Sequence, residues 1–182
     1  MHYLDLPRAG VALLALGLIL ISPDQAGAQQ QEWTSYGSDL ASSKYVPLQQ
    51  INADNVGDLE IAWMWETPDN ELFRSRADVS AAEYKSTPLM VNGALYVSTS
   101  LGQVGAVDAL TGEELWTFDT GSWQRGRHPN FNNNHRGVAW WDDGGDGRIL
   151  MAANDGVLWS LNARTGQPDP NFANNGQMDL KQ

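Results

Sequence analysis

A repeat of 53 to 54 residues within this 182-residue chain restricts it to a few architectures. Residues 95–118, LYVSTSLGQVGAVDALTGEELWTF, align with residues 149–172, ILMAANDGVLWSLNARTGQPDPNF, and the offset from Gly102 to Gly156 is 54 residues. The earlier segment WMWET at 63–67 aligns in the same way with WTFDT, which begins 53 residues later. Repeats of this length are typical of propellers, solenoids and helical arrays.

The repeated unit has the local chemistry of short strands joined by tight turns. The apolar and β-branched run ALYVST at 94–99 predicts a strand, Gly102 a hairpin turn, and the alternating QVGAVDA at 103–109 the next strand. Asp108 and Gly112 have the residue types of a second turn, before another strand at LWTF. A helical repeat needs apolar residues at i, i+3, i+4 and i+7, and the glycine spacing interrupts every such window. Three tryptophans are predicted to be packing residues: Trp63, Trp116 and Trp159.

Three or four antiparallel strands in each unit match one blade of a β-propeller, so the predicted fold class is all-β. The chain holds about three such units, whereas propellers close with roughly four to eight blades. An open arc would expose sheet faces and edge strands. We therefore expect residues 29–182 to be the N-terminal, incomplete part of a propeller domain in a longer protein, comprising its first three or so blades.

Residues 1–28 have the pattern of a secretory signal peptide. Arg8 precedes the apolar run at 11–21, and Ala26-Gly27-Ala28 supplies small residues at a cleavage site. The alternative is an uncleaved membrane anchor, but the apolar run is shorter than the ~20 residues that span a bilayer. The pattern therefore predicts secretion of the chain with removal of residues 1–28.

Composition excludes several classes of site. The chain has no cysteine, so it holds no c-type haem attachment, thiolate zinc site or lipid-modified N-terminal cysteine. A net charge of -11 argues against a nucleic-acid partner, because nucleic-acid binding depends on cationic contacts with phosphates.

Two further motifs do not indicate metal sites. DDGGDGR at 142–148 fails the EF-hand pattern because Ala153 stands where the loop needs glutamate, and this segment predicts a turn. His128 and His135 lie in or beside an asparagine-rich loop and could ligate a metal, but no acidic or thiolate partner is near them in sequence. The loop at 122–134 is predicted to be a polar excursion between blades, near a substrate entrance.

The segment Ala106–Trp116, AVDALTGEELW, resembles the tryptophan-docking motif of quinoprotein alcohol and glucose dehydrogenases. Residues 33–63, STPLMVNGALYVST at 86–99, and HRGVAWW at 135–141 also resemble the early part of that family, in the same order. The resemblance implies an eight-bladed propeller that holds pyrroloquinoline quinone (PQQ) with a calcium or lanthanide ion at its axis. It implies oxidation of an alcohol, sugar or polyol in the periplasm, with electrons passing to ubiquinone or a cytochrome.

The resemblance also implies three cofactor contacts. Arg136 occupies the position of a PQQ-binding arginine, and a guanidinium suits a carboxylate. Gly137 would allow close approach of the backbone to the ligand, and Lys85 stands where some relatives have a glutamate. The alternative for Arg136 is a surface ion pair with Asp142 or Asp143.

The sequence also departs from the family pattern. Ala152 replaces a threonine contact, and the absence of adjacent cysteines favours the sugar- and polyol-oxidising branches. The metal ligands and catalytic aspartate of the family would lie downstream of residue 182, so no catalytic or metal residue is predicted within the chain, which alone would be inactive. The alternative function is a non-catalytic propeller acting as a scaffold in the cell envelope, such as the scaffold subunit of outer-membrane barrel assembly. Such scaffolds are typically lipoproteins, and the absence of cysteine counts against this alternative.

Overall fold

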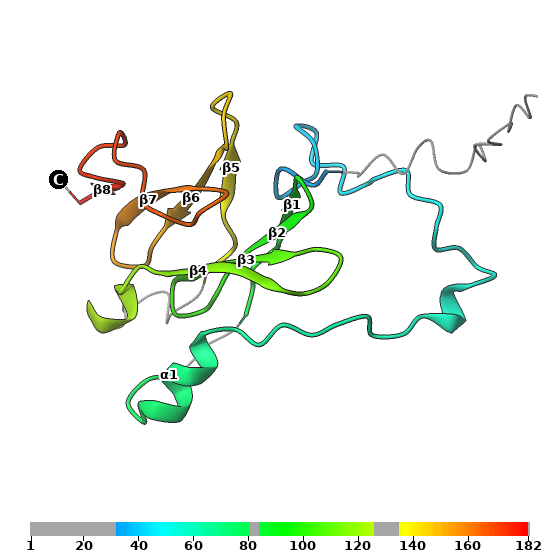
Figure 1. Cartoon of the computed structure of the whole chain (residues 1–182), viewed down its shortest axis with the longest axis horizontal. Helices are drawn as coiled ribbons and strands as arrows, with labels where there is room; N and C mark the ends of the chain where they lie inside the picture. Colours follow the sequence, from blue (N-terminus) through cyan, green and yellow to red (C-terminus); the bar gives the residue numbers. More distant parts are fainter. Residues whose placement is uncertain (1–31, 81–83, 126–134, 182) are drawn as a thin grey trace, which may run out of the picture.

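The computed structural model describes residues 32–80, 84–125 and 135–181, and the predicted signal peptide lies outside these residues. The described residues form two four-stranded sheets with one short α-helix (Figure 1). None of the helices in these ranges has the length and apolar character needed to span a membrane. The elements are η2 (Val56–Asp58), α1 (Asp69–Ser75), β1 (Leu89–Val91), β2 (Ala94–Ser98), β3 (Gln103–Asp108), β4 (Glu114–Asp119), η3 (Ser122–Arg125), β5 (Ala139–Trp141), β6 (Arg148–Ala152), β7 (Val157–Asn162) and β8 (Gln177–Asp179).

The first sheet is an antiparallel meander in the order β1-β2-β3-β4, as the repeat predicts. Asn92 and Gly93 join β1 to β2 with φ angles of 51° and 77°, the positive values that a two-residue hairpin requires. At the β3–β4 turn the Asp108 carboxylate accepts hydrogen bonds from the backbone N–H groups of Leu110 (2.9 Å) and Thr111 (2.8 Å). The predicted strands and turns of this unit are confirmed.

The second sheet repeats the first in the order β5-β6-β7-β8. Asn162 takes the place of the aspartate at the β7–β8 connection, and its side-chain oxygen accepts a hydrogen bond from the Thr165 N–H at 2.9 Å. The DDGGDGR segment forms the predicted turn, in which the Gly144 N–H donates to Asp142 Oδ1 at 2.9 Å. The same side-chain capping chemistry therefore shapes both units.

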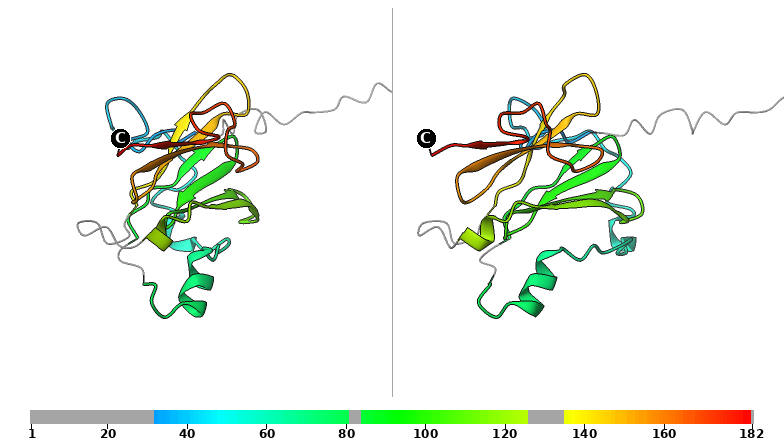
Figure 2. Two further views of the ribbon diagram at one scale, coloured as in Figure 1. Left: turned by 90° about the vertical axis from the view of Figure 1, so that its left-hand side faces the viewer. Right: turned by 60° about the vertical axis from the view of Figure 1, so that its left-hand side comes forward.

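The core lies between the two sheets, whose faces pack against one another (Figure 2). Trp116, on β4, reaches across to the second sheet, where its Nε1–H donates to the Ala163 carbonyl at 2.8 Å. Its indole lies over Gly166 and 6.0 Å from the Tyr96 ring. Buried side chains from both sheets complete this core: Leu89, Val91, Ala94, Tyr96, Val104, Ala106, Ile149, Met151, Leu161 and Ala163.

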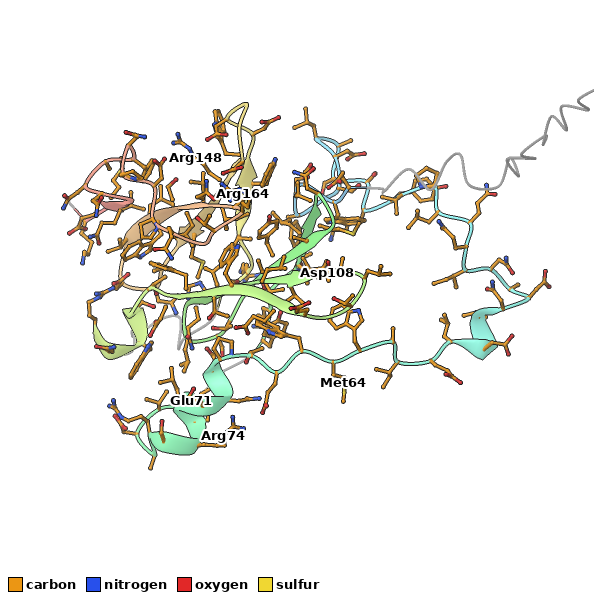
Figure 3. The ribbon with its side chains drawn as sticks, viewed as in Figure 1. Met64, Glu71, Arg74, Asp108, Arg148 and Arg164 are labelled. Atoms are coloured by element: carbon orange, nitrogen blue, oxygen red, sulfur yellow. The ribbon has the colours of Figure 1, made fainter. Side chains whose placement is uncertain are left out.

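Residues 63–67 contact the first sheet as β4 contacts the second. Trp63 lies over Gly112 and donates from Nε1 to the Ala109 carbonyl at 3.3 Å. The segment runs past the first sheet in an extended form, with Met64 exposed (Figure 3). The described residues thus give two complete four-stranded sheets and one segment in the fourth-strand position of a further unit. The predicted packing role of Trp63 and Trp116 is confirmed, as is that of Trp159, whose ring centroid lies 5.0 Å from that of Phe118.

Candidate functional site

The segments that lead into the first strand of each sheet lie side by side. Thr87 and Gly137 form a parallel bridge, and the Thr87 N–H donates to the Arg136 carbonyl at 3.4 Å. Because β1 begins just after Thr87 and β5 just after Val138, the two innermost strands start at the same place. Two residues 51 positions apart in the sequence, Lys85 and Arg136, are thereby brought to one groove.

The groove has a volume of about 630 Å³ and combines two cations with an apolar wall. The wall comes from the face of the second sheet that is turned away from the core, where Leu150 and Leu158 are only partly buried. Such an arrangement can hold a flat molecule by its apolar face while the cations meet its negative groups. The lining residues are Tyr36, Lys85, Thr87, Arg136, Gly137, Val138, Ala139, Leu150, Ala152 and Leu158.

Arg136 does not form the surface ion pair that was its alternative interpretation. The described residues contain no ion pair between Arg136 and Asp142 or Asp143, and Asp143 instead pairs with Arg148 at 3.1 Å. Arg136 is exposed at the groove. All three sequence-predicted contacts, Lys85, Arg136 and Gly137, line this one groove, whereas their contact with PQQ stays a prediction.

Gly137 has a structural reason to be glycine. Its φ angle is +125°, a region that side chains disfavour, and a Cβ here would lie 3.0 Å from the Thr87 carbonyl oxygen. The close backbone approach seen in the structure is therefore between the two segments that lead into β1 and β5, which we call the strand entrances. Ala152 lines the same groove.

Sequence reasoning missed Tyr36 and Thr87 as lining residues. Tyr36 reaches the groove because the N-terminal segment lies along β1, where Trp33 and Met90 exchange backbone hydrogen bonds of 2.8 Å and 3.0 Å. The segment around Tyr36 has no strand periodicity, so no sequence pattern predicts that this residue lines the groove. Thr87 could have been found, since it lies within the STPL segment that precedes β1.

A buried histidine, His135, directly precedes Arg136 in the chain. His135 is 5% exposed, and its Nε2 has no hydrogen-bond partner among the described residues. Burial lowers the pKa of His135 to about 4, although the negative charges of Asp69 and Asp155 act in the opposite direction. The ring is therefore neutral at physiological pH.

No metal centre is evident in the described ranges, which contain no group of three or more histidine, cysteine, aspartate or glutamate residues able to hold an ion. His128 lies outside the described residues, so the alternative of a histidine pair is not tested. That the metal ligands come from beyond residue 182 stays a prediction.

Comparison with known proteins agrees with this architecture. The family model "Glucose/ethanol/alcohol dehydrogenase, beta-propeller domain" matches residues 33–182. The dehydrogenase subunit of a quinone alcohol dehydrogenase from Gluconobacter oxydans is 33% identical over 161 residues, covering 83% of this chain and 18% of that protein. A quinoprotein glucose dehydrogenase from the same organism is 33% identical over 174 residues, covering 87% and 20%.

The crystal structure of quinohemoprotein alcohol dehydrogenase from Comamonas testosteroni superimposes with a TM-score of 0.62 and 30% identity, covering 84% of this chain and 20% of that one. The chain spans about a fifth of the length of these relatives. Since the family model matches residues 33–182 and the sheets superimpose on a solved relative, the chain belongs to the PQQ-dependent alcohol and glucose dehydrogenases, as part of their β-propeller domain.

Proposed function

We propose that this chain is the N-terminal part of a periplasmic dehydrogenase that uses PQQ to oxidise an alcohol, sugar or polyol hydroxyl. The relatives are named as quinone-linked, quinoprotein and quinohemoprotein dehydrogenases of alcohols or glucose, which supports this reaction class. Electrons would then pass to a quinone or a cytochrome. The observation that carries the proposal is the groove in which Lys85 and Arg136 meet an apolar wall.

The residues of the groove fit PQQ in shape and charge. PQQ is a flat molecule with three carboxylates, and Arg136 offers a planar, permanently charged group with several donors. Lys85 adds a second positive charge to the same space, and Val138 and Leu158 offer apolar surface to the flat ring system. The volume of about 630 Å³ also lies within the range of roughly 300–1,000 Å³ that small-molecule sites occupy.

This part of the chain contributes binding and orientation. PQQ, when bound, supplies the two-electron oxidation of the substrate carbon–hydrogen bond. Arg136 and Lys85 would fix the carboxylates, and the apolar wall would exclude water from one face of the ring. The calcium or lanthanide ion implied by the family would be held by residues outside this chain.

The test is a PQQ titration of the complete gene product, followed by quenching of tryptophan fluorescence. Replacing Arg136 with alanine removes charge-assisted hydrogen bonds worth about 1.5–3 kcal/mol, so the Kd should rise about ten- to a hundredfold. The matched control is Arg164→Ala, because Arg164 is an exposed arginine paired with Asp146 at 2.8 Å and does not line the groove. Equal affinities of the two variants would overturn the role of Arg136. A wild-type protein without saturable PQQ binding would favour the scaffold alternative.

The proposed location has its own test. Signal peptide cleavage after Ala28 would give a periplasmic protein whose N-terminal sequence begins Gln29-Gln30-Gln31. Recovery of the protein in membranes with its first 28 residues intact would instead support the anchor alternative.

A further inference from the structure

One buried carboxylate holds the β2–β3 turn in place. Asp69, the first residue of α1, is 2% exposed and lies beneath this turn. Each carboxylate oxygen accepts two hydrogen bonds, and the four donors belong to three turn residues and to Gln103, the first residue of β3. The donors are the Thr99 hydroxyl at 2.6 Å, the Gln103 side-chain amide at 2.9 Å, the Ser100 hydroxyl at 3.0 Å and the Leu101 backbone N–H at 3.0 Å.

The end of β2, directly before this turn, contacts the segment that carries Lys85. Ser98, the last residue of β2, is fully buried, and its hydroxyl forms a 3.0 Å hydrogen bond with the Ser86 hydroxyl. Ser86 lies between Lys85 and Thr87, the residue that bridges to Gly137. The position of this strand entrance therefore depends on where β2 ends.

The other side of the turn supports the segment that carries Arg136. Gly102 lies against the buried His135 ring, because a Cβ on this glycine would be 3.2 Å from His135 Nε2. The hydroxyl of Thr120, the residue that follows β4, donates to the Gly102 carbonyl at 2.7 Å and holds the turn in place from that side. His135 immediately precedes Arg136, so a shift of the turn would move the arginine as well.

We propose that Asp69 is a positioning residue that fixes Lys85 and Arg136 in the groove through the β2–β3 turn. This inference rests on the proposed function, since it concerns the same groove. Both cations are exposed and have long side chains, so the location of their charges depends on how firmly their backbone segments are held. Four hydrogen bonds to one buried carboxyl group hold these donors close together. No neutral side chain could accept all four donors in the same way.

The variant Asp69→Asn tests the proposal. The asparagine NH₂ group replaces one of the two carboxylate oxygens. If it replaces Oδ1, it faces the side-chain N–H of Gln103, and if it replaces Oδ2, it faces the backbone N–H of Leu101. In either case two donors meet and the hydrogen bond is lost. Glu71→Gln is the matched control, since it removes a carboxylate from the exposed side of the same helix (Figure 3). The complete gene product is used, with two measurements: hydrogen–deuterium exchange without cofactor, and the Kd for PQQ.

For Asp69→Asn we expect backbone exchange at residues 84–87 and 135–138 to accelerate at least tenfold, while exchange in β6 and β7 stays as in wild type. The Kd for PQQ should rise at least tenfold. Glu71→Gln should change neither quantity. Exchange and affinity equal to those of the control would overturn the proposal, as would a uniform acceleration that includes β6 and β7, because this would show general destabilisation.

A second variant guards against a protein that does not fold. Thr99→Val keeps the side-chain shape and removes the shortest of the four bonds, so the same two measurements decide the proposal if Asp69→Asn is not obtained folded. Failure of the proposed function can be told apart from failure of this inference. If the wild-type protein binds no PQQ, the proposed function fails, and hydrogen–deuterium exchange still shows whether Asp69 restrains the two segments.

Discussion

Replacing Gly166 should destabilise the protein for two separable reasons, its left-handed backbone conformation and its contact with the Trp116 indole. Gly166 has a φ angle of +69°, and a Cβ added there would lie 2.5 Å from the indole Cδ2 of Trp116. Alanine at this position must therefore adopt a disfavoured backbone conformation and displace the indole. Displacement would break the 2.8 Å hydrogen bond from Trp116 to the Ala163 carbonyl and the contact with Tyr96.

The magnitude follows from these parts. The left-handed conformation costs an alanine about 1 kcal/mol. Loss of the indole hydrogen bond adds about 1 kcal/mol, and loss of the aromatic contact with Tyr96 adds about 0.5–1.5 kcal/mol. Gly166→Ala should therefore lower the free energy of unfolding by about 2–4 kcal/mol. Gly144 is the matched control, since it has a φ angle of +79° and no atom lies within 4 Å of an added Cβ. Replacing Gly144 with alanine should therefore cost only the backbone contribution of about 1 kcal/mol.

Urea unfolding followed by circular dichroism measures both variants in the same protein. The difference between Gly166→Ala and Gly144→Ala isolates the docking contribution, which we expect to be about 1–3 kcal/mol. Equal midpoints and slopes for the two variants would refute the reasoning, because the backbone cost alone would then account for the glycine. A difference that persists when Trp116 is already alanine would refute it as well, since the indole would no longer be present to clash.

Two further predictions concern buried ionisable groups. Because burial holds the His135 pKa near 4 rather than 6.5, the unfolded chain binds more protons between these pH values, so the free energy of unfolding should fall by up to about 3 kcal/mol as the pH drops from 6.5 to 4. Urea midpoints at several pH values check this, and an equally steep dependence in His135→Gln would contradict it. Arg148 pairs with the largely buried Asp169 at 2.8 Å, so Arg148→Met should destabilise the protein by about 1–3 kcal/mol, because it leaves the Asp169 carboxylate without this partner. Arg164→Met, which removes an exposed pair in the same unit, should leave the thermal midpoint nearly unchanged, and equal losses from both variants would argue against this reasoning.

The fold was predictable to the extent that it depends on local chemistry. Asp108 and Gly112 form their turn with neighbours only a few residues away, so their types and spacing reveal it. The 53- to 54-residue offset then predicts the equivalent turn at Asn162. Even the docking of Trp63 follows from its alignment with Trp116, because both place an indole on the glycine of the next unit.

The site was only partly predictable, because its supporting contacts connect distant residues. Arg136 and Gly137 were found from a motif that resembles a known family. By contrast, Asp69 accepts a hydrogen bond from the Thr99 hydroxyl, 30 positions away, and α1 lies outside the aligned segments of the repeat. Tyr36 depends on the pairing of Trp33 with Met90, in a segment without strand periodicity. Neither propensity nor repeat spacing contains information about such contacts.

The two ends of each sheet have different roles. The β3–β4 and β7–β8 connections hold the docking turns, and there the two units keep the same chemistry because each unit must receive a tryptophan from its neighbour. The opposite end holds the β2–β3 turn and the segments that lead into β1 and β5, where we propose that a ligand binds, and there the two units diverge. The polar residues Ser98, Thr99 and Gln103 of the first unit align with Ala152, Ala153 and Val157 of the second. The repeat therefore identifies the end that stabilises the propeller, and departures from the repeat identify the end at which a ligand would bind.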